Sequence, residues 1–320
     1  MERRKLNAEV LSGRQLAVAA LVAGLSPAAV WAGQAMWFWV LLWSGAAVIL
    51  AALVLWRMKS APAGRFALPI RILYAGWAVV LSSRVLSGTA ERLEQTSGGS
   101  PGFWLLVIVV VPLAIIGWGK AAPLFRMTEI LWLALAVTLV LVCVPAVGAI
   151  EWRGLLVRST DWKTAALTVG EIMVPAVFVL PYIYSVESGS GGKGIRWLSA
   201  LGGIAGVMCL LTAGMLGAGS VQVPQAFFAA AGLTGGNARS EGLLSVIWLL
   251  PDLVYVSLLC RTWGRRWWPG VAAVLSAAVS MTGIQKYFET EICVVGTLLL
   301  LFLTVLFCGK REKFVVQKKR

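Results

Sequence analysis

The sequence contains no histidine, and only 13% of its 320 residues are charged. Without histidine, the chain lacks the commonest metal ligand in proteins and the commonest acid–base group at neutral pH. The motifs of phosphate-binding loops, serine hydrolases and zinc proteases are missing as well. We therefore expect no catalytic residues, no metal site and no cofactor, and we do not interpret the chain as an enzyme.

Cysteine is also scarce, and its positions exclude the usual roles of paired thiols. The five cysteines are Cys143, Cys209, Cys260, Cys293 and Cys308. All of them lie within or at the ends of apolar segments, and none has the CxxC spacing of a metal or redox site. We expect them to act as small apolar packing residues rather than as disulfides or ligands.

Apolar residues dominate the chain. Hydrophobic residues make up 59% of it and the mean hydropathy is +0.84, values far from those of soluble domains. The net charge of +14 would suggest a nucleic-acid ligand in a soluble protein. Here most basic residues flank apolar segments, where anionic lipid headgroups lie, so we expect a lipid bilayer as partner and no nucleic acid.

Ten apolar segments are long enough, at about 20 residues, to cross a bilayer as helices. They cover residues 16–35, 37–56, 66–85, 101–118, 127–147, 165–185, 197–217, 243–260, 267–283 and 292–308. The sequence thus predicts an all-α integral membrane protein, with ten transmembrane helices in a single domain spanning residues 1–320. The helices divide five plus five, into halves of about 1–150 and 151–320.

The basic residues predict how this domain is oriented. With ten spans and a cytoplasmic amino terminus, the inner segments carry roughly three times as many lysines and arginines as the outer ones, as the positive-inside rule requires. Both termini are then cytoplasmic. Arg84 and Arg92 fall on the outer side, beside a loop at 86–100 in which we expect only a short amphipathic turn.

Glu171 is the most informative single residue. It lies in the apolar sixth segment, between Gly170 and Pro175. A carboxylate at membrane depth costs at least several kcal/mol unless it is paired, protonated or hydrated, and broken backbone occurs there only when buried in protein or lining a cavity. This pattern is typical of a substrate or ion site.

The first segment has a matching interruption at Gly24, Ser26 and Pro27. Breaks at corresponding positions of two halves indicate a midplane site between inverted repeats, where half-helix ends point at the ligand. On this hypothesis the helix end near 24–27 receives an anionic group, and Glu171 receives an ammonium group or a proton. The alternative is that proline and glycine only kink two packed helices.

Further candidates lie on the third and eighth helices. Asp252 follows a proline in the middle of the eighth helix, with no neighbour of opposite charge in sequence, so it is either functional or a hydrogen-bonded packing residue. The aromatic side chains of Tyr74, Trp77, Trp248 and Tyr255 are candidate walls of the ligand site.

Two pairs of charges are interpreted as structural. Arg126 and Glu129 are three residues apart, on one helix face, close enough to pair. Arg239 and Glu241 are two residues apart and point in different directions, so each is expected to have a partner on another element.

Several stretches of the chain together form a recognisable set of motifs. They are residues 119–129 with their Arg-x-x-Glu ending, Gly170-Glu171-Ile172 with the later Pro181-Tyr182, Arg239-Ser-Glu-Gly-Leu-Leu-x-x-Ile-Trp248, Leu11-Ser-Gly-Arg-Gln15 and Gln34-Ala-Met-Trp37. In these stretches, and in order over nearly the whole chain, the sequence resembles the B subunits of spore nutrient-germinant receptors.

This resemblance implies membership of the amino acid-polyamine-organocation superfamily, with helices one and six unwound at the site. It also implies a location in the bacterial cell membrane, specifically the spore inner membrane, with a receptor A subunit and a C-subunit lipoprotein as partners. The ligand would be a small nutrient such as an amino acid, bound in a transporter-like pocket. The alternative function is a proton- or cation-coupled secondary amino acid transporter of the same superfamily, because both use one fold and one pocket.

Overall fold

The computed structural model describes residues 12–34, 36–57, 67–97, 100, 104, 121–151, 155, 162–180, 182, 191–223, 225–234, 238–261 and 268–307. Within these ranges the chain is helical and contains no strand. The helices are α1 (Gly13–Trp31), α2 (Trp37–Arg57), α3 (Ala67–Ser97), α5 (Ala121–Gly148), α6 (Trp162–Val179), α7 (Gly191–Leu216), α8 (Ala226–Thr234), α9 (Ala238–Ile247), α10 (Leu249–Arg261), α11 (Trp268–Thr282) and α12 (Thr290–Phe307), with short 3-10 turns at Gly217–Val221 and Ile284–Tyr287.

Seven of the described helices are long and apolar enough to cross a bilayer, and they correspond to the predicted spans one, two, three, five, six, seven and eight. Spans nine and ten correspond to the shorter apolar helices Trp268–Thr282 and Thr290–Leu306. The predicted fourth span, 101–118, lies outside the described residues except for Trp104. The prediction of a helical membrane protein is therefore confirmed, for the part of the chain that the structure describes.

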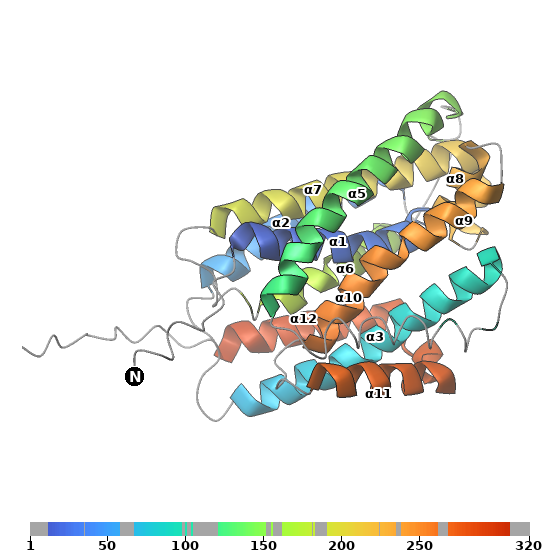
Figure 1. Cartoon of the computed structure of the whole chain (residues 1–320). Helices are drawn as coiled ribbons and strands as arrows, with labels where there is room; N and C mark the ends of the chain where they lie inside the picture. The colour runs from blue at the N-terminus through green and yellow to red at the C-terminus, as the bar shows by residue number, and fades with distance from the viewer. Residues whose placement is uncertain are drawn as a thin grey trace, which may run out of the picture.

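The long helices lie side by side in one bundle with two ends (Figure 1). At the end where α1 begins, Arg14 contacts Glu129 near the start of α5, and the Tyr182 hydroxyl donates to the carbonyl of Arg261, the last residue of α10. At the other end, the Ser220 hydroxyl donates to the carbonyl of Gly33, just beyond α1. We call these the Gly13 end and the Trp31 end.

Helix α1 forms the centre of the bundle, and α2 and α5 form its periphery. In the apolar window of α1 78% of the residues are buried, against 17% in α2 and 11% in α5. The α1 sequence is rich in alanine, and small side chains allow α6, α7 and α10 to approach it closely. The exposed leucines and valines of α2 and α5 are then the surface that meets lipid.

Three sequence predictions about helix limits are wrong. Helices α1 and α6 each continue without a break through Pro27 and Pro175. A proline removes only one hydrogen bond of its helix, and neighbouring helices in a membrane bundle tolerate that loss. Helix α3 does not end near residue 85 but continues to Ser97, so Arg84 and Arg92 lie on a helix and not beside a loop.

The interrupted span is instead the eighth. A turn at Trp248 separates α9 from α10, and Pro251 follows three residues later. Pro251 has no N–H to donate to the carbonyl of Ile247, the last residue of α9, and its ring crowds that carbonyl. The break therefore has a local covalent cause, and it places Asp252 directly after it.

The contact between α1 and α6 yields a testable expectation about Gly24. A Cβ atom on Gly24 would lie 2.9 Å from the backbone oxygen of Ile172 and 2.5 Å from Leu201. The backbone of α6 cannot move locally, so we expect Gly24→Ala to destabilise the bundle by about 1–3 kcal/mol. Thermal unfolding in detergent measures the effect.

The matched control is Gly45→Ala on α2, where an added Cβ meets nothing within 4 Å. This variant is expected to keep or slightly raise stability, because alanine favours a helix over glycine. Equal unfolding midpoints for the two variants would contradict the close packing of α1 on α6.

Candidate functional site

Glu171 is held in an ion pair with Arg84 of α3. Its Oε1 atom accepts a hydrogen bond from Arg84 Nη1 at 2.8 Å, and its Oε2 atom accepts one from the indole of Trp31. The two charged side chains are 14% and 25% exposed, so the pair is largely but not completely shielded from the surroundings. A paired carboxylate can stay ionised at membrane depth. The ion pair with Arg84 therefore offsets the free-energy cost of placing the Glu171 carboxylate in an apolar segment.

Several helices converge on this pair. Thr290, the first residue of α12, lies 3.4 Å from the second guanidinium nitrogen of Arg84. Tyr255 of α10 is buried and lies close enough to Glu171 and Arg84 to interact with them electrostatically. Cys293 of α12 lies next to Arg84. The ion pair therefore connects α3 with α6 and is bordered by α1, α10 and α12.

A polar recess opens above Arg84. Its volume is about 380 Å³, and its lining consists of Arg84, Ser87, Gly88, Glu91, Phe288, Glu289 and Thr290. The side chains of Glu91 and Glu289 are exposed, whereas Arg84 is mostly covered. The recess thus leads from the surface, near the start of α12, to a guanidinium group that already holds Glu171. We call this recess the Arg84 recess.

Asp252 forms a second ion pair with α3. Its Oδ2 atom accepts hydrogen bonds from Arg92 and, at 2.9 Å, from the Thr89 hydroxyl. The Arg92 and Asp252 side chains are only 3% and 2% exposed, and the Arg92 guanidinium lies 5.0 Å from the ring centre of Phe228. Of the two roles considered for Asp252, this geometry supports the packing role, and Asp252 does not line the Arg84 recess.

The predicted pocket around Gly24, Ser26 and Pro27 is occupied by packed side chains. Ser26 and Pro27 are buried inside α1, and Gly24 is pressed against α6 and α7. Gly170 likewise packs against Val294, because a Cβ atom added to Gly170 would lie 2.6 Å from the Val294 side chain. Pro175 is buried in α6. The structure brings the two glycine segments together, but as a helix contact and not as a lining of the Arg84 recess.

The half-helix end on which the predicted anion site depends is not present in α1. Because α1 is continuous, it has no free amide groups near residues 24–27. Pro27 deprives the carbonyl of Ala23 of its donor, and a carbonyl attracts cations rather than anions.

The candidate aromatic walls are mainly packing and hydrogen-bonding groups. Tyr74 bonds to the Thr304 hydroxyl at 3.0 Å, and Trp77 donates to Thr297 at 3.0 Å. The Trp248 indole donates to the carbonyl of Leu25 at 3.3 Å, which anchors the α9–α10 turn on α1. Tyr255 lies within range of an electrostatic interaction with Glu171.

The predicted structural pairs have different partners or fall outside the described side chains. The ion pair described for Glu129 is with Arg14, at 3.4 Å, and not with the exposed Arg126. Glu241 lies against Gly232 of α8: a Cβ atom added to Gly232 would lie 3.4 Å from the Glu241 carboxylate. The side chain of Arg239 is outside the described residues.

Sequence reasoning missed Arg84, Arg92 and the two carboxylates of the recess, Glu91 and Glu289. A usable signal was present, because Leu86, Ala90 and Leu93 continue the apolar helical spacing of α3 beyond residue 85 and are all buried. Extending the helix would have placed both arginines in the bundle.

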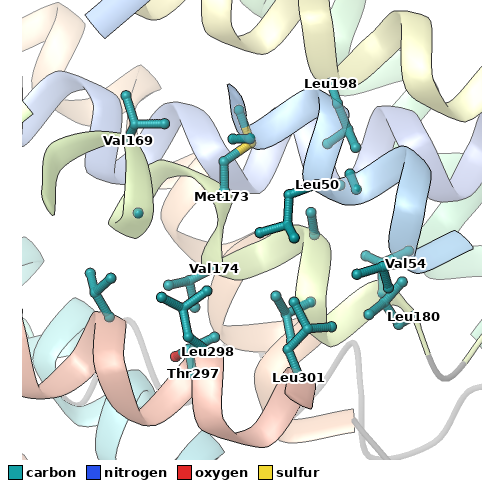
Figure 2. Close-up of a pocket in the computed structure, with 18 of the residues that line it drawn as sticks. Leu50, Val54, Val169, Met173, Val174, Leu180, Leu198, Thr297, Leu298 and Leu301 are labelled. Atoms are coloured by element: carbon teal, nitrogen blue, oxygen red, sulfur yellow. The ribbon is translucent and has the colours of Figure 1, made fainter. Parts of the chain in front are cut away.

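A second cavity is an apolar groove of about 540 Å³ lined mainly by residues of α2, α6 and α12. Leu50, Met173, Val174, Leu298 and Leu301 point into it from these three helices (Figure 2). An amino acid would lose its hydration there, because the Trp43 indole and the Thr297 hydroxyl are the polar side-chain groups among the described lining residues, and neither carries a charge. We therefore assign no polar ligand to this groove, and Glu171 is not among its lining residues.

No family model matches the chain, and no curated protein matches it either.

Proposed function

We propose that the protein is a membrane subunit of a spore nutrient-germinant receptor, which binds an amino acid at the Arg84–Glu171 pair and passes the change to partner subunits. The main observation that supports this proposal is the Arg84–Glu171 ion pair. It joins a helix of the first half to a helix of the second half, at the base of a recess that opens at the Trp31 end. A ligand that alters this pair alters the contact between the halves.

The packing of the helices supports a five-plus-five repeat. In such a repeat α1 corresponds to α6, α2 to α7, α3 to α10 and α5 to α12. The contact of α1 with α7 then matches that of α6 with α2, and the contact of α1 with α5 matches that of α6 with α12. The contact of α5 with α10 likewise matches that of α12 with α3. Each pairing maps onto the other when the two sets of five helices are exchanged. Because five is an odd number, the second set enters the membrane from the opposite side, which makes the repeat inverted.

The chemistry of the pair suits the carboxylate end of an amino acid. A guanidinium group binds a carboxylate through two parallel hydrogen bonds, and in the resting structure Glu171 occupies one of these positions. The ligand carboxylate then competes with Glu171 for Arg84. A ligand that binds the separated state better shifts the population towards it, as a receptor requires.

The orientation follows from the charge distribution. The positive-inside rule places the Gly13 end in the cytoplasm, so the Arg84 recess faces the outer side. Nutrient arriving from outside the spore inner membrane would meet it there. The motif resemblance supplies the partners, an A subunit and a C-subunit lipoprotein.

A binding and uptake experiment tests this function. We expect the purified protein in lipid nanodiscs to bind at least one standard amino acid, and proteoliposomes containing it alone to accumulate none against a gradient. Uphill accumulation of a labelled amino acid would instead establish the secondary transporter. Failure to bind any amino acid, in protein that unfolds cooperatively, would exclude both functions.

A further inference from the structure

The rim of the Arg84 recess is acidic, which the resting ion pair does not explain. Glu91 and Glu289 line the recess and are exposed, and they come from different elements, α3 and the residue before α12. Arg84 is already neutralised by Glu171. Among the described lining residues, the mouth of the recess therefore carries two negative charges and its base carries the cation.

The base of the recess offers attraction for an anion from two sources. Arg84 is 25% exposed, and its second terminal nitrogen makes a long contact, 3.4 Å, with the Thr290 hydroxyl. Thr290 also begins α12, an 18-residue helix whose amino-terminal end carries partial positive charge. A carboxylate at this position would meet both the guanidinium group and the helix end.

One wall of the recess is apolar. Phe288 is half-buried, and its ring contacts Trp77 edge to face, with 6.3 Å between the ring centres. This contact holds the ring in place, and Gly88 adds no side chain to the recess. The recess therefore presents a cation at the base, two carboxylates at the rim and an aromatic wall.

We propose that the Arg84 recess is the outer recognition site for the intact amino acid, with the ligand ammonium group held by Glu91 and Glu289 and its carboxylate directed to Arg84. This assignment deepens the proposed function and rests on it. The two ends of a zwitterion match the two charged ends of the recess. The acidic rim selects ligands that carry an amine, and it orients them so that the carboxylate reaches Arg84 first.

The test uses charge removal at the rim, where folding does not depend on the side chains. The double variant E91Q/E289Q removes both carboxylates. The matched control E94Q/E291Q removes two exposed carboxylates from the same two segments, neither of which lines the recess. Calorimetry first measures the binding of each standard amino acid to the full-length protein in nanodiscs. For the amino acid that binds, it then measures the binding of two analogues, the amine that lacks the carboxylate and the acid that lacks the amino group.

We expect E91Q/E289Q to weaken binding of the amino acid and of the amine by roughly 3- to 10-fold and to leave the acid unaffected or bound more tightly. The control is expected to change none of the three, and added salt should reduce the difference, because exposed charges are screened. Unchanged amino acid affinity in E91Q/E289Q would overturn the proposal. So would an amine that binds as tightly as the amino acid, because the carboxylate would then have no role.

The outcomes also separate this proposal from the proposed function. If no amino acid binds to the unmodified protein, the proposed function fails and the recognition site fails with it. If an amino acid binds and depends on Arg84, but is indifferent to Glu91 and Glu289, only the recognition site fails.

Discussion

Replacing Asp252 by asparagine is expected to lower the free energy of unfolding by about 3–5 kcal/mol, because it breaks a buried ion pair. The side chain of its partner Arg92 is only 3% exposed. Without the carboxylate, the guanidinium charge stays buried, with the Thr89 hydroxyl and the face of Phe228 among its surroundings. Unfolding in detergent, followed by circular dichroism, measures the loss.

A double replacement distinguishes the charge from the packing. The variant R92L/D252L leaves no charge to bury and substitutes apolar side chains, so it is expected to recover most of the stability lost in D252N. The control is Glu94→Gln, an exposed acid on the same helix, which should have little effect. A double variant as unstable as the single one would contradict the ion-pair explanation.

Arg84→Gln and Glu171→Gln are expected to change ligand binding in opposite directions. Loss of Arg84 removes the charge-assisted hydrogen bonds to the ligand carboxylate, worth about 1.5–3 kcal/mol each, and should weaken binding by about 10- to 100-fold or more. Loss of the Glu171 charge removes the competitor for Arg84 and should keep or tighten binding. It should also uncouple binding from the response, because the contact between α3 and α6 is already weakened.

The double variant R84Q/E171Q separates binding from folding. It contains no unpaired charge, so it should be more stable than R84Q alone, in which Glu171 loses its cation and keeps only the Trp31 donor among the described bonds. Its binding should nevertheless stay lost. Recovered binding in the double variant, or a nutrient response in E171Q with unchanged concentration dependence, would remove Arg84 and Glu171 from the mechanism.

The apolar segments were predictable because the requirement that determines them is local. A helix needs about 20 apolar residues to cross a bilayer, and this can be counted along the chain. Segments 37–56 and 127–147 correspond closely to α2 and α5. The end of α3 was less predictable. An arginine such as Arg84 normally marks the end of a membrane helix, and only its partner on α6, Glu171, explains why it lies within one.

Gly24 and Pro27 show why the predicted site was misplaced. The same residues serve a broken helix at a ligand site or a close helix contact, and their spacing does not distinguish the two. Only the packed structure places the backbone of α6 against Gly24 and leaves α1 continuous. Asp252 presents the same limitation, because Arg92 lies 160 residues away in sequence.

The sequence by itself determined that the chain is a helical membrane protein and that Glu171 needs a compensating partner, because hydrophobic length and the cost of a buried charge depend on residue type alone. The tertiary structure decided which partner that is, and where ligand can reach it. Arg84 and Glu289 approach one another only because α3 and α12 pack together, and no local pattern encodes that contact.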